Sequence, residues 1–114
     1  MTFKQIATMI RSIGFPFAYY QFPEGTAQAP PFICYFFDGD NDLKADNSNY
    51  QKIEHLNIEL YTDEKDFEAE AQIEDVLRAA GLVWSRAEEY IDSERLFLVV
   101  YELDIIIKQE ANNG

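Results

Sequence analysis

The side chains that could carry chemistry are few, and they do not form a recognisable catalytic group. His55 is the only histidine of the sequence and Cys34 is the only cysteine. A histidine on a half-buried strand is more often a hydrogen-bonded surface or edge residue than a base. The apolar neighbours of Cys34 favour an inert thiol with a raised pKa. Because one histidine and one cysteine provide neither a zinc cluster nor a locally spaced Cys–His pair, the sequence predicts no catalytic residue.

The acidic run at residues 38–42 is the stretch most similar to a metal-binding loop. It reads DGDND, a composition found in calcium-binding loops. The twelve-residue EF-hand loop, however, needs glycine at its sixth position and glutamate at its twelfth. Counted from Asp38, these positions hold Leu43 and Asn49. We therefore expect a solvated turn, no bound metal and no cofactor, and we expect that the protein is not an enzyme.

The composition indicates one acidic domain. The chain has 114 residues, of which 47% are hydrophobic, and a formal net charge of −12. This length allows one core but not two. The negative charge disfavours contact with phosphate and anionic lipid, so we expect no sequence-specific nucleic-acid partner and no membrane. The longest apolar run, residues 96–101, is far too short for a membrane span, and no secretory signal is recognisable.

The best-specified stretch is residues 53–81, a strand that continues directly into a helix. Between residues 56 and 60, apolar residues alternate with polar ones, which is the period of a half-buried strand. From residue 69 to residue 80, apolar residues recur at helical spacing. Asp66 is a suitable N-cap for this helix, and Gly81 is a suitable left-handed residue beyond its last turn.

The remaining patterns predict an α+β domain with the element order α-β-β-β-α-β-β. Short turns between strands favour a mainly antiparallel sheet of about five strands, with both helices packed on one face. The domain spans residues 1–108, and residues 109–114 form a flexible C-terminal tail. Residues 38–49 form a long turn or flexible loop. The predicted helices are residues 3–13 and 66–80, and the predicted strands are residues 17–22, 32–37, 50–61, 82–90 and 96–107.

Periodicity also predicts the core and leaves a second apolar face. Both faces are apolar in residues 32–37 and in residues 96–101, whereas two helices can cover about one face of the sheet. Either the loop at residues 25–31 and sheet curvature cover the second face, or another chain does; we favour another chain. The predicted subunit interface is Ile33, Tyr35, Phe37, Leu96 and Leu98. The predicted core is Ile6, Ile10, Ile13, Leu56, Ile58, Leu60, Ile73, Val76, Leu77, Val99 and Tyr101.

Three stretches of the chain form a recognisable combination. They are YQFPEG at residues 20–25 with PFICY at 31–35, ADN at 45–47 with Tyr50 and IELYTDEKD at 58–66, and EYIDSERL at 89–96 with VYE at 100–102. Together they resemble small proteins from the head–tail joining and tail gene clusters of long-tailed phages, and of prophages in Gram-positive bacteria. The likeness covers about residues 15–107.

This resemblance implies a structural virion protein of the neck or tail, tail-terminator-like or head–tail joining, made in the bacterial cytoplasm. Such proteins assemble into a ring, commonly hexameric, that caps the tail tube and joins it to the head connector. The implied partners are copies of the chain itself, the tail tube protein and head connector proteins. The resemblance transfers no active-site residue. Because a basic channel wall would retain DNA phosphates, we expect acids at the lumen, chiefly in residues 38–46 and 63–75. The named candidates are Asp38, Asp40, Asp42 and Asp46.

A second class of function fits the same charge. An acidic inhibitor or DNA mimic would spread carboxylates at phosphate-like spacing over a continuous surface and occupy the basic groove of a host protein. The strands with two apolar faces favour packing between subunits instead. Size-exclusion behaviour separates the two hypotheses, since concentration-dependent oligomers favour the virion protein and a salt-insensitive monomer favours the mimic. The sequence identifies neither the phage nor the ring size nor the neighbouring proteins.

Overall fold

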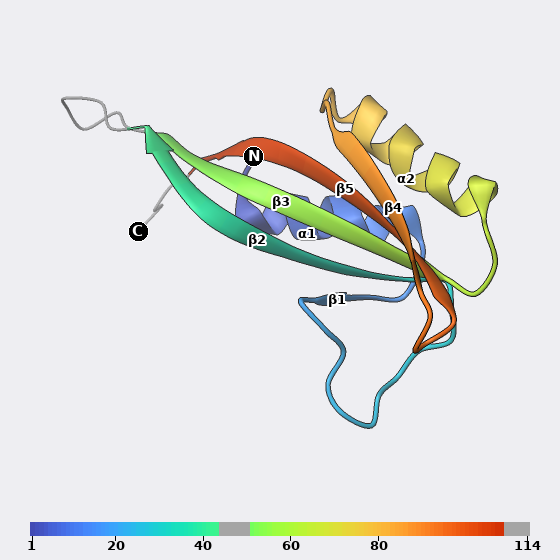
Figure 1. Cartoon of the computed structure of the whole chain (residues 1–114). Coiled ribbons are helices and arrows are strands. Elements are labelled where there is room, and N and C mark those ends of the chain that lie inside the picture. Colours follow the sequence, from blue (N-terminus) through green and yellow to red (C-terminus); the bar gives the residue numbers. More distant parts are fainter. Residues whose placement is uncertain (44–50, 109–114) are drawn as a thin grey trace.

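The chain follows the predicted order α-β-β-β-α-β-β through the residues that the structure describes (Figure 1). The computed structural model describes residues 1–43 and 51–108 of the 114. The predicted tail at residues 109–114 lies outside the described residues. The elements are α1 (Phe3–Ile13), β1 (Phe17–Tyr19), β2 (Phe32–Leu43), β3 (Gln51–Thr62), α2 (Phe67–Ala79), β4 (Ser85–Ile91) and β5 (Leu96–Ile107).

The five strands of the described chain form one mixed sheet in the order β1-β2-β3-β5-β4. β1 pairs with β2 in parallel, and the other three neighbouring pairs are antiparallel, which confirms the mainly antiparallel prediction. β3 and β5 form the long central pair, with Lys52 opposite Ile107 at one end and Thr62 opposite Phe97 at the other. This register determines which side chains of β3 and β5 share each face of the sheet.

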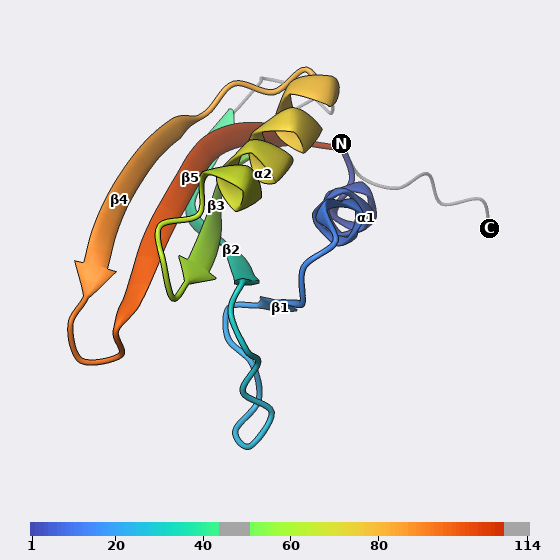
Figure 2. The ribbon, with the colours of Figure 1, turned by 90° about the vertical axis from the view of Figure 1, so that its right-hand side faces the viewer.

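Both helices lie on the same face of the sheet, as predicted (Figure 2). α1 begins with a capping box, in which the Gln5 amide donates to Thr2 Oγ1 at 3.1 Å and the Thr2 amide donates to Gln5 Oε1 at 2.9 Å. α2 begins after Asp66, whose side chain accepts a hydrogen bond from the Ala69 amide at 2.9 Å. Gly81, at φ +73°, follows α2 in the left-handed region.

The core lies between the helices and the face of the sheet that they cover. Ile6 and Ile10 of α1, together with Ile73 and Leu77 of α2, are fully buried against it. All residues of the predicted core are buried except Val76, which is partly buried against the same cluster. The periodicity of the sequence therefore identifies the covered faces of both helices and of the two central strands.

β2 is longer than predicted. The expected loop over residues 38–49 was wrong for residues 38–43, which belong to β2 and pair with β3. The register places Asp42 opposite Lys52, and opposite charges at directly opposed positions favour antiparallel pairing. A bulge accommodates Gly39 at φ +79°. An acidic segment with a glycine is typical of a turn, so only the partner strand reveals this extension.

Two other strands are shorter than predicted. β1 ends at Tyr19, because Tyr20 adopts a left-handed backbone with φ +69°. β4 begins at Ser85, while Leu82 and Trp84 pack against the core from the preceding connection. The early end of β1 leaves residues 20–31 as a long loop that projects beyond the edge of the sheet (Figure 1).

Candidate functional site

Three of the five predicted interface residues lie on the face that the helices cover. Ile33 is fully buried and Tyr35 is 8% exposed, and both belong to the core. Phe37 packs against the same cluster, and its ring meets that of Phe3 from α1 at 5.1 Å between centroids. Their assignment to the uncovered face was therefore wrong. β2 is apolar on both faces, so its sequence does not reveal which set of side chains turns toward the helices.

Leu96 and Leu98 lie on the opposite face, so the structure does not bring the five residues together. In β5, Val99 and Tyr101 are buried in the core, and alternate strand positions therefore turn Leu96 and Leu98 away from the helices. Whether any of the five residues contacts another subunit stays a prediction. The surface that the two helices leave uncovered is named here the helix-free face, and its central residues are Phe32, Cys34, Phe36, Glu59, Tyr61, Leu96 and Leu98.

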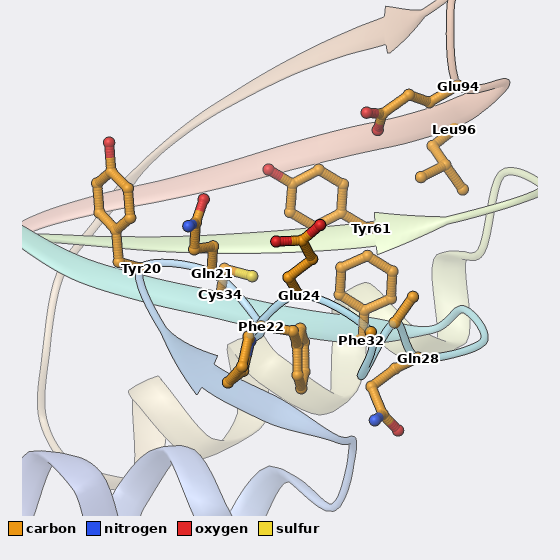
Figure 3. A pocket seen from close by; sticks show the side chains of 13 residues that line it. Tyr20, Gln21, Phe22, Glu24, Gln28, Phe32, Cys34, Tyr61, Glu94 and Leu96 are labelled. Atoms are coloured by element: carbon orange, nitrogen blue, oxygen red, sulfur yellow. The ribbon is translucent and has the colours of Figure 1, made fainter.

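The helix-free face is hollowed beside the loop at residues 20–31 (Figure 3). The hollow has a volume of about 720 Å³. Phe32 and Cys34 of β2 and Tyr61 of β3 line it from the sheet, while the loop and the turn that precedes β5 provide its sides. We name this hollow the groove, and its main residues are Tyr20, Phe22, Glu24, Phe32, Cys34, Tyr61, Glu94 and Leu96.

Aromatic rings form most of the apolar surface of the groove. Phe32 and Tyr61 stack with their centroids 4.9 Å apart and their planes inclined by 16°. Phe22 of the loop meets Phe32 edge-on at 5.5 Å, and Tyr20 meets Phe36 at 5.5 Å. Offset and edge-to-face pairs of this kind hold rings in fixed positions. The loop is therefore anchored to the sheet by its aromatic side chains and keeps the groove open.

The charged residues of the groove are acidic. Glu24 and Glu94 are exposed at its sides, and no lysine or arginine is found among the described residues that line it. Beside it, Tyr61 Oη donates to Glu59 Oε1 at 3.1 Å. Burial raises the pKa of the Glu59 carboxyl, and burial and the neighbouring Glu59 raise the pKa of Tyr61. An apolar floor with acidic sides favours a partner that offers apolar and cationic groups together.

Cys34 lies in the groove but is not an activated nucleophile. Its side chain is 5% exposed. Burial, and secondarily the carboxylate of Glu59, raises the pKa of the Cys34 thiol from 9.0 to about 11. Because the thiolate is the reactive form, a thiol with this pKa is almost entirely protonated at neutral pH. The expected rise in the pKa of this thiol is confirmed, and its low reactivity stays a prediction.

A polar cluster surrounds His55 further along the helix-free face. His55 Nδ1 lies 2.9 Å from Asp104 Oδ1, and Nε2 lies 3.0 Å from Glu102 Oε1 and 4.0 Å from Asp38 Oδ1. The hydrogen bond with Asp104, followed by that with Glu102, raises the pKa of His55. Asn57 Nδ2 donates to Asp38 at 2.6 Å. His55 is thus a hydrogen-bonded strand residue held by carboxylates.

The predicted lumen acids are described only in part. Asp38 is exposed and belongs to the cluster around His55. Asp40 and Asp42 belong to β2, and the structure describes their backbone but not their side chains. Asp46 lies outside the described residues. Within residues 1–43 and 51–108, no group of three or more His, Cys, Asp or Glu side chains is placed to hold a metal ion. No helix in the same ranges is long and apolar enough to cross a membrane.

Glu70 corrects the expectation that the acids of residues 63–75 are available at a lumen surface. Glu70 is 5% exposed, and its carboxylate forms an ion pair with Lys65 Nζ at 2.6 Å. Arg86 of β4 also pairs with Glu70. The sequence contains the signal for this burial, because Glu70 precedes Ile73 by three residues and therefore lies on the same helical face.

Sequence reasoning did not assign the groove. The sequence predicts a loop only at residues 25–31, as one possible cover for the second apolar face, and it assigns residues 17–22 and 50–61 to strands. The signal that could have located the site is the concentration of aromatic residues on both sides of this loop. Their meeting depends on the β2–β3 register, which places Phe32 opposite Tyr61.

No family model matches the sequence, and no curated protein matches it. Among solved structures, the virion of a native gene transfer agent particle contains a chain with a similar fold. The TM-score is 0.56, the sequence identity is 10%, and the match covers 94% of this chain and 89% of that chain. At this identity the likeness concerns the fold. The α+β arrangement described above therefore recurs, nearly complete, in a chain of a virion particle.

Proposed function

We propose that this protein is a structural component of a phage-like virion. The observation that carries the proposal is the fold shared with a chain of the gene transfer agent virion over 94% of this chain and 89% of that one. A match of this extent relates two whole domains, not a common local motif. The resemblance of residues 15–107 to phage neck and tail proteins supports the same assignment from the sequence.

Within the virion, we propose a tail-terminator-like or head–tail joining role in the neck or tail. In this role copies of the chain form a ring that contacts the tail tube protein and head connector proteins. The supporting observation is the groove, where aromatic rings line a hollow of about 720 Å³ on a face without helices. Apolar hollows of this kind on a small protein mark interaction surfaces.

The proposed role is mechanical and involves no catalysis. Cys34 is held in its protonated form, and His55 is held by Asp104 and Glu102 with no hydroxyl or thiol partner among the described residues. The proposed location is the virion, after synthesis in the host cytoplasm. Because the sides of the groove are acidic, it repels phosphate, and we propose neither a sequence-specific nucleic-acid partner nor a membrane.

The test is disruption of the gene in the phage or prophage that encodes it, followed by electron microscopy of the particles and proteomics of purified virions. We expect the protein in wild-type virions, and separate heads and tails after disruption, with joining restored by a plasmid-borne copy. Normal virions after disruption would contradict the neck or tail role. Absence of the protein from purified virions would contradict the structural role and return attention to an acidic inhibitor.

A further inference from the structure

The charges of the chain are segregated along its sequence. Residues 1–23 contain Lys4 and Arg11 and no acid, so all 21 acids lie after them. Both cations are exposed on α1, and neither forms an ion pair within the described chain. Lys65 and Arg86, by contrast, are paired with acids of the same chain. α1 is therefore a basic element on an otherwise acidic molecule.

Exposed aromatic side chains accompany the cations of α1. Phe3 is 48% exposed and Tyr19 of β1 is 53% exposed. Both rings contact Phe37, at 5.1 Å and 6.2 Å between centroids, and are thereby held in place. We name Phe3, Lys4, Arg11 and Tyr19 the basic aromatic surface. It lies on the helix-covered side of the sheet, and the groove lies on the helix-free side (Figures 2 and 3).

We propose that the groove of one copy of this chain receives the basic aromatic surface of a neighbouring copy, with Arg11 beside Glu24 and Glu94 of the neighbour. This rests on the proposed function as a self-assembling virion protein, and it names the contact between subunits. Two chains that each carry a net charge of −12 repel one another. A contact between copies is therefore favoured where the local charge is opposite in sign, and α1 carries two exposed cations and no acid.

The chemistry of the two surfaces is complementary in two respects. A guanidinium group forms ion pairs with carboxylates and stacks on aromatic faces, and the groove offers both kinds of partner. The side chains of Glu24 and Glu94 have no partner within the described chain, so they are available to a neighbour. Phe3 and Tyr19 provide apolar area for the rings of the groove.

The proposed contact also determines the kind of assembly. It joins two different surfaces, so every bound copy still offers one free groove and one free basic aromatic surface. Such heterologous contacts continue from copy to copy and end in a ring when the rotation between copies closes. The contact therefore explains how one acidic chain builds a closed structure from itself.

The experiment is a charge reversal with rescue by mixing, read by sedimentation velocity and negative-stain microscopy of the full chain. Arg11→Glu places an acid opposite the acids of the groove, and Glu94→Arg places a cation opposite Arg11. Each variant alone should weaken self-association by at least about tenfold relative to wild type. In an equimolar mixture every contact between unlike copies is complementary again, so assembly should return in alternating order.

Glu68→Arg is the matched control, because Glu68 is an exposed acid on α2, away from the groove. It makes the same change of charge and should leave self-association within about twofold of wild type, as expected for a position outside the contact. Circular dichroism and thermal unfolding establish that each variant is folded. If Glu94→Arg fails to fold, Glu24→Arg makes the same reversal from the loop.

Three results would overturn the proposal: single variants that assemble like wild type, a mixture no better than its components, or a wild type that stays monomeric at every concentration. None of these results decides whether the protein belongs to a virion. That question is answered separately by the proteomics of purified particles. The subunit contact can therefore be wrong while the proposed function stands, and the proposed function can be wrong while the subunit contact stands.

Discussion

Phe32 and Tyr61 are directly opposed on β2 and β3, and their rings stack at 4.9 Å on the helix-free face. The same register places Ile33 opposite Leu60 on the covered face, where both are buried. A slip of one residue would exchange the two faces of the strand. The buried pair thus fixes the register, and the register builds the floor of the groove.

We predict that Phe32 and Tyr61 are energetically coupled. Phe32→Leu and Tyr61→Leu should each lower the free energy of unfolding in urea, and the double variant should reveal a coupling of about 0.5–1.5 kcal/mol, the range for aromatic pairs. Phe32→Leu combined with Tyr90→Leu is the control, because β4 is separated from β2 by β3 and β5. If the effects of Phe32→Leu and Tyr61→Leu on the free energy of unfolding were additive, like those of the control pair, the two rings would not be stacked.

We predict that Leu77 of α2 is essential to the core. It is fully buried, so Leu77→Ala should lower the free energy of unfolding by about 2–5 kcal/mol through lost burial and a new cavity. Val83, which is 87% exposed, provides the comparison, and Val83→Ala should change stability by less than about 0.5 kcal/mol. Equal effects of the two substitutions would mean that the face of α2 is assigned incorrectly.

The core could be predicted from the sequence wherever an element has a single apolar face. In α1, α2 and β3 the apolar residues recur at a spacing that fits only one face of the element, and in the structure that face is buried. β2 has two apolar faces, so Ile33 and Tyr35 could be assigned only after their partners on β3 were known. The groove joins residues 20–31 to β3 and β5, and such contacts between distant segments leave no local period in the sequence.

We predict that Glu70 stabilises the junction of α2 with β4. Its nearly buried carboxylate pairs with Lys65 and Arg86. Glu70→Gln keeps the size of the side chain but removes the charge, and it should lower the free energy of unfolding by about 1–3 kcal/mol, the range for hydrogen bonds to charged groups. The exposed Glu68 is the matched control. Similar, near-zero effects of Glu70→Gln and Glu68→Gln would show that the pairing is not formed.

We predict that the pKa of His55 is above 6.5, because Asp104 and Glu102 of β5 and Asp38 of β2 surround its ring. A raised pKa in the folded state means that protonated His55 stabilises the fold. This contribution is fully present below about pH 6.5 and is lost as pH rises through the folded-state value. As the only histidine, His55 gives one imidazole resonance in an NMR titration.

Asp104→Asn separates the causes of this shift. The hydrogen bond with Asp104 is the largest of them, so the substitution should lower the pKa of His55 more than Glu102→Gln does. Both variants should flatten the dependence of the melting temperature on pH above pH 6.5. A titration midpoint at or below 6.5 in the wild type would contradict the cluster.

The last prediction uses Cys34 as a reporter of the groove. Burial raises its pKa from 9.0 to about 11, which lowers the thiolate fraction at pH 8 by on the order of a hundredfold. An aromatic disulfide reagent should therefore react slowly with the native protein and rapidly in denaturant. Since the chain has one cysteine, the absorbance change reports this thiol alone. Comparable rates in both conditions would show that Cys34 is accessible and activated.

The same reaction tests the subunit contact without a change in the groove itself. If a neighbouring copy fills the groove, the rate for wild type should fall as the protein concentration rises through the range of assembly. Arg11→Glu leaves the groove unaltered but should self-associate at least about tenfold more weakly, so its rate should stay nearly constant over the same range. A wild-type rate that is independent of concentration, while sedimentation shows assembly, would place the contact elsewhere on the molecule.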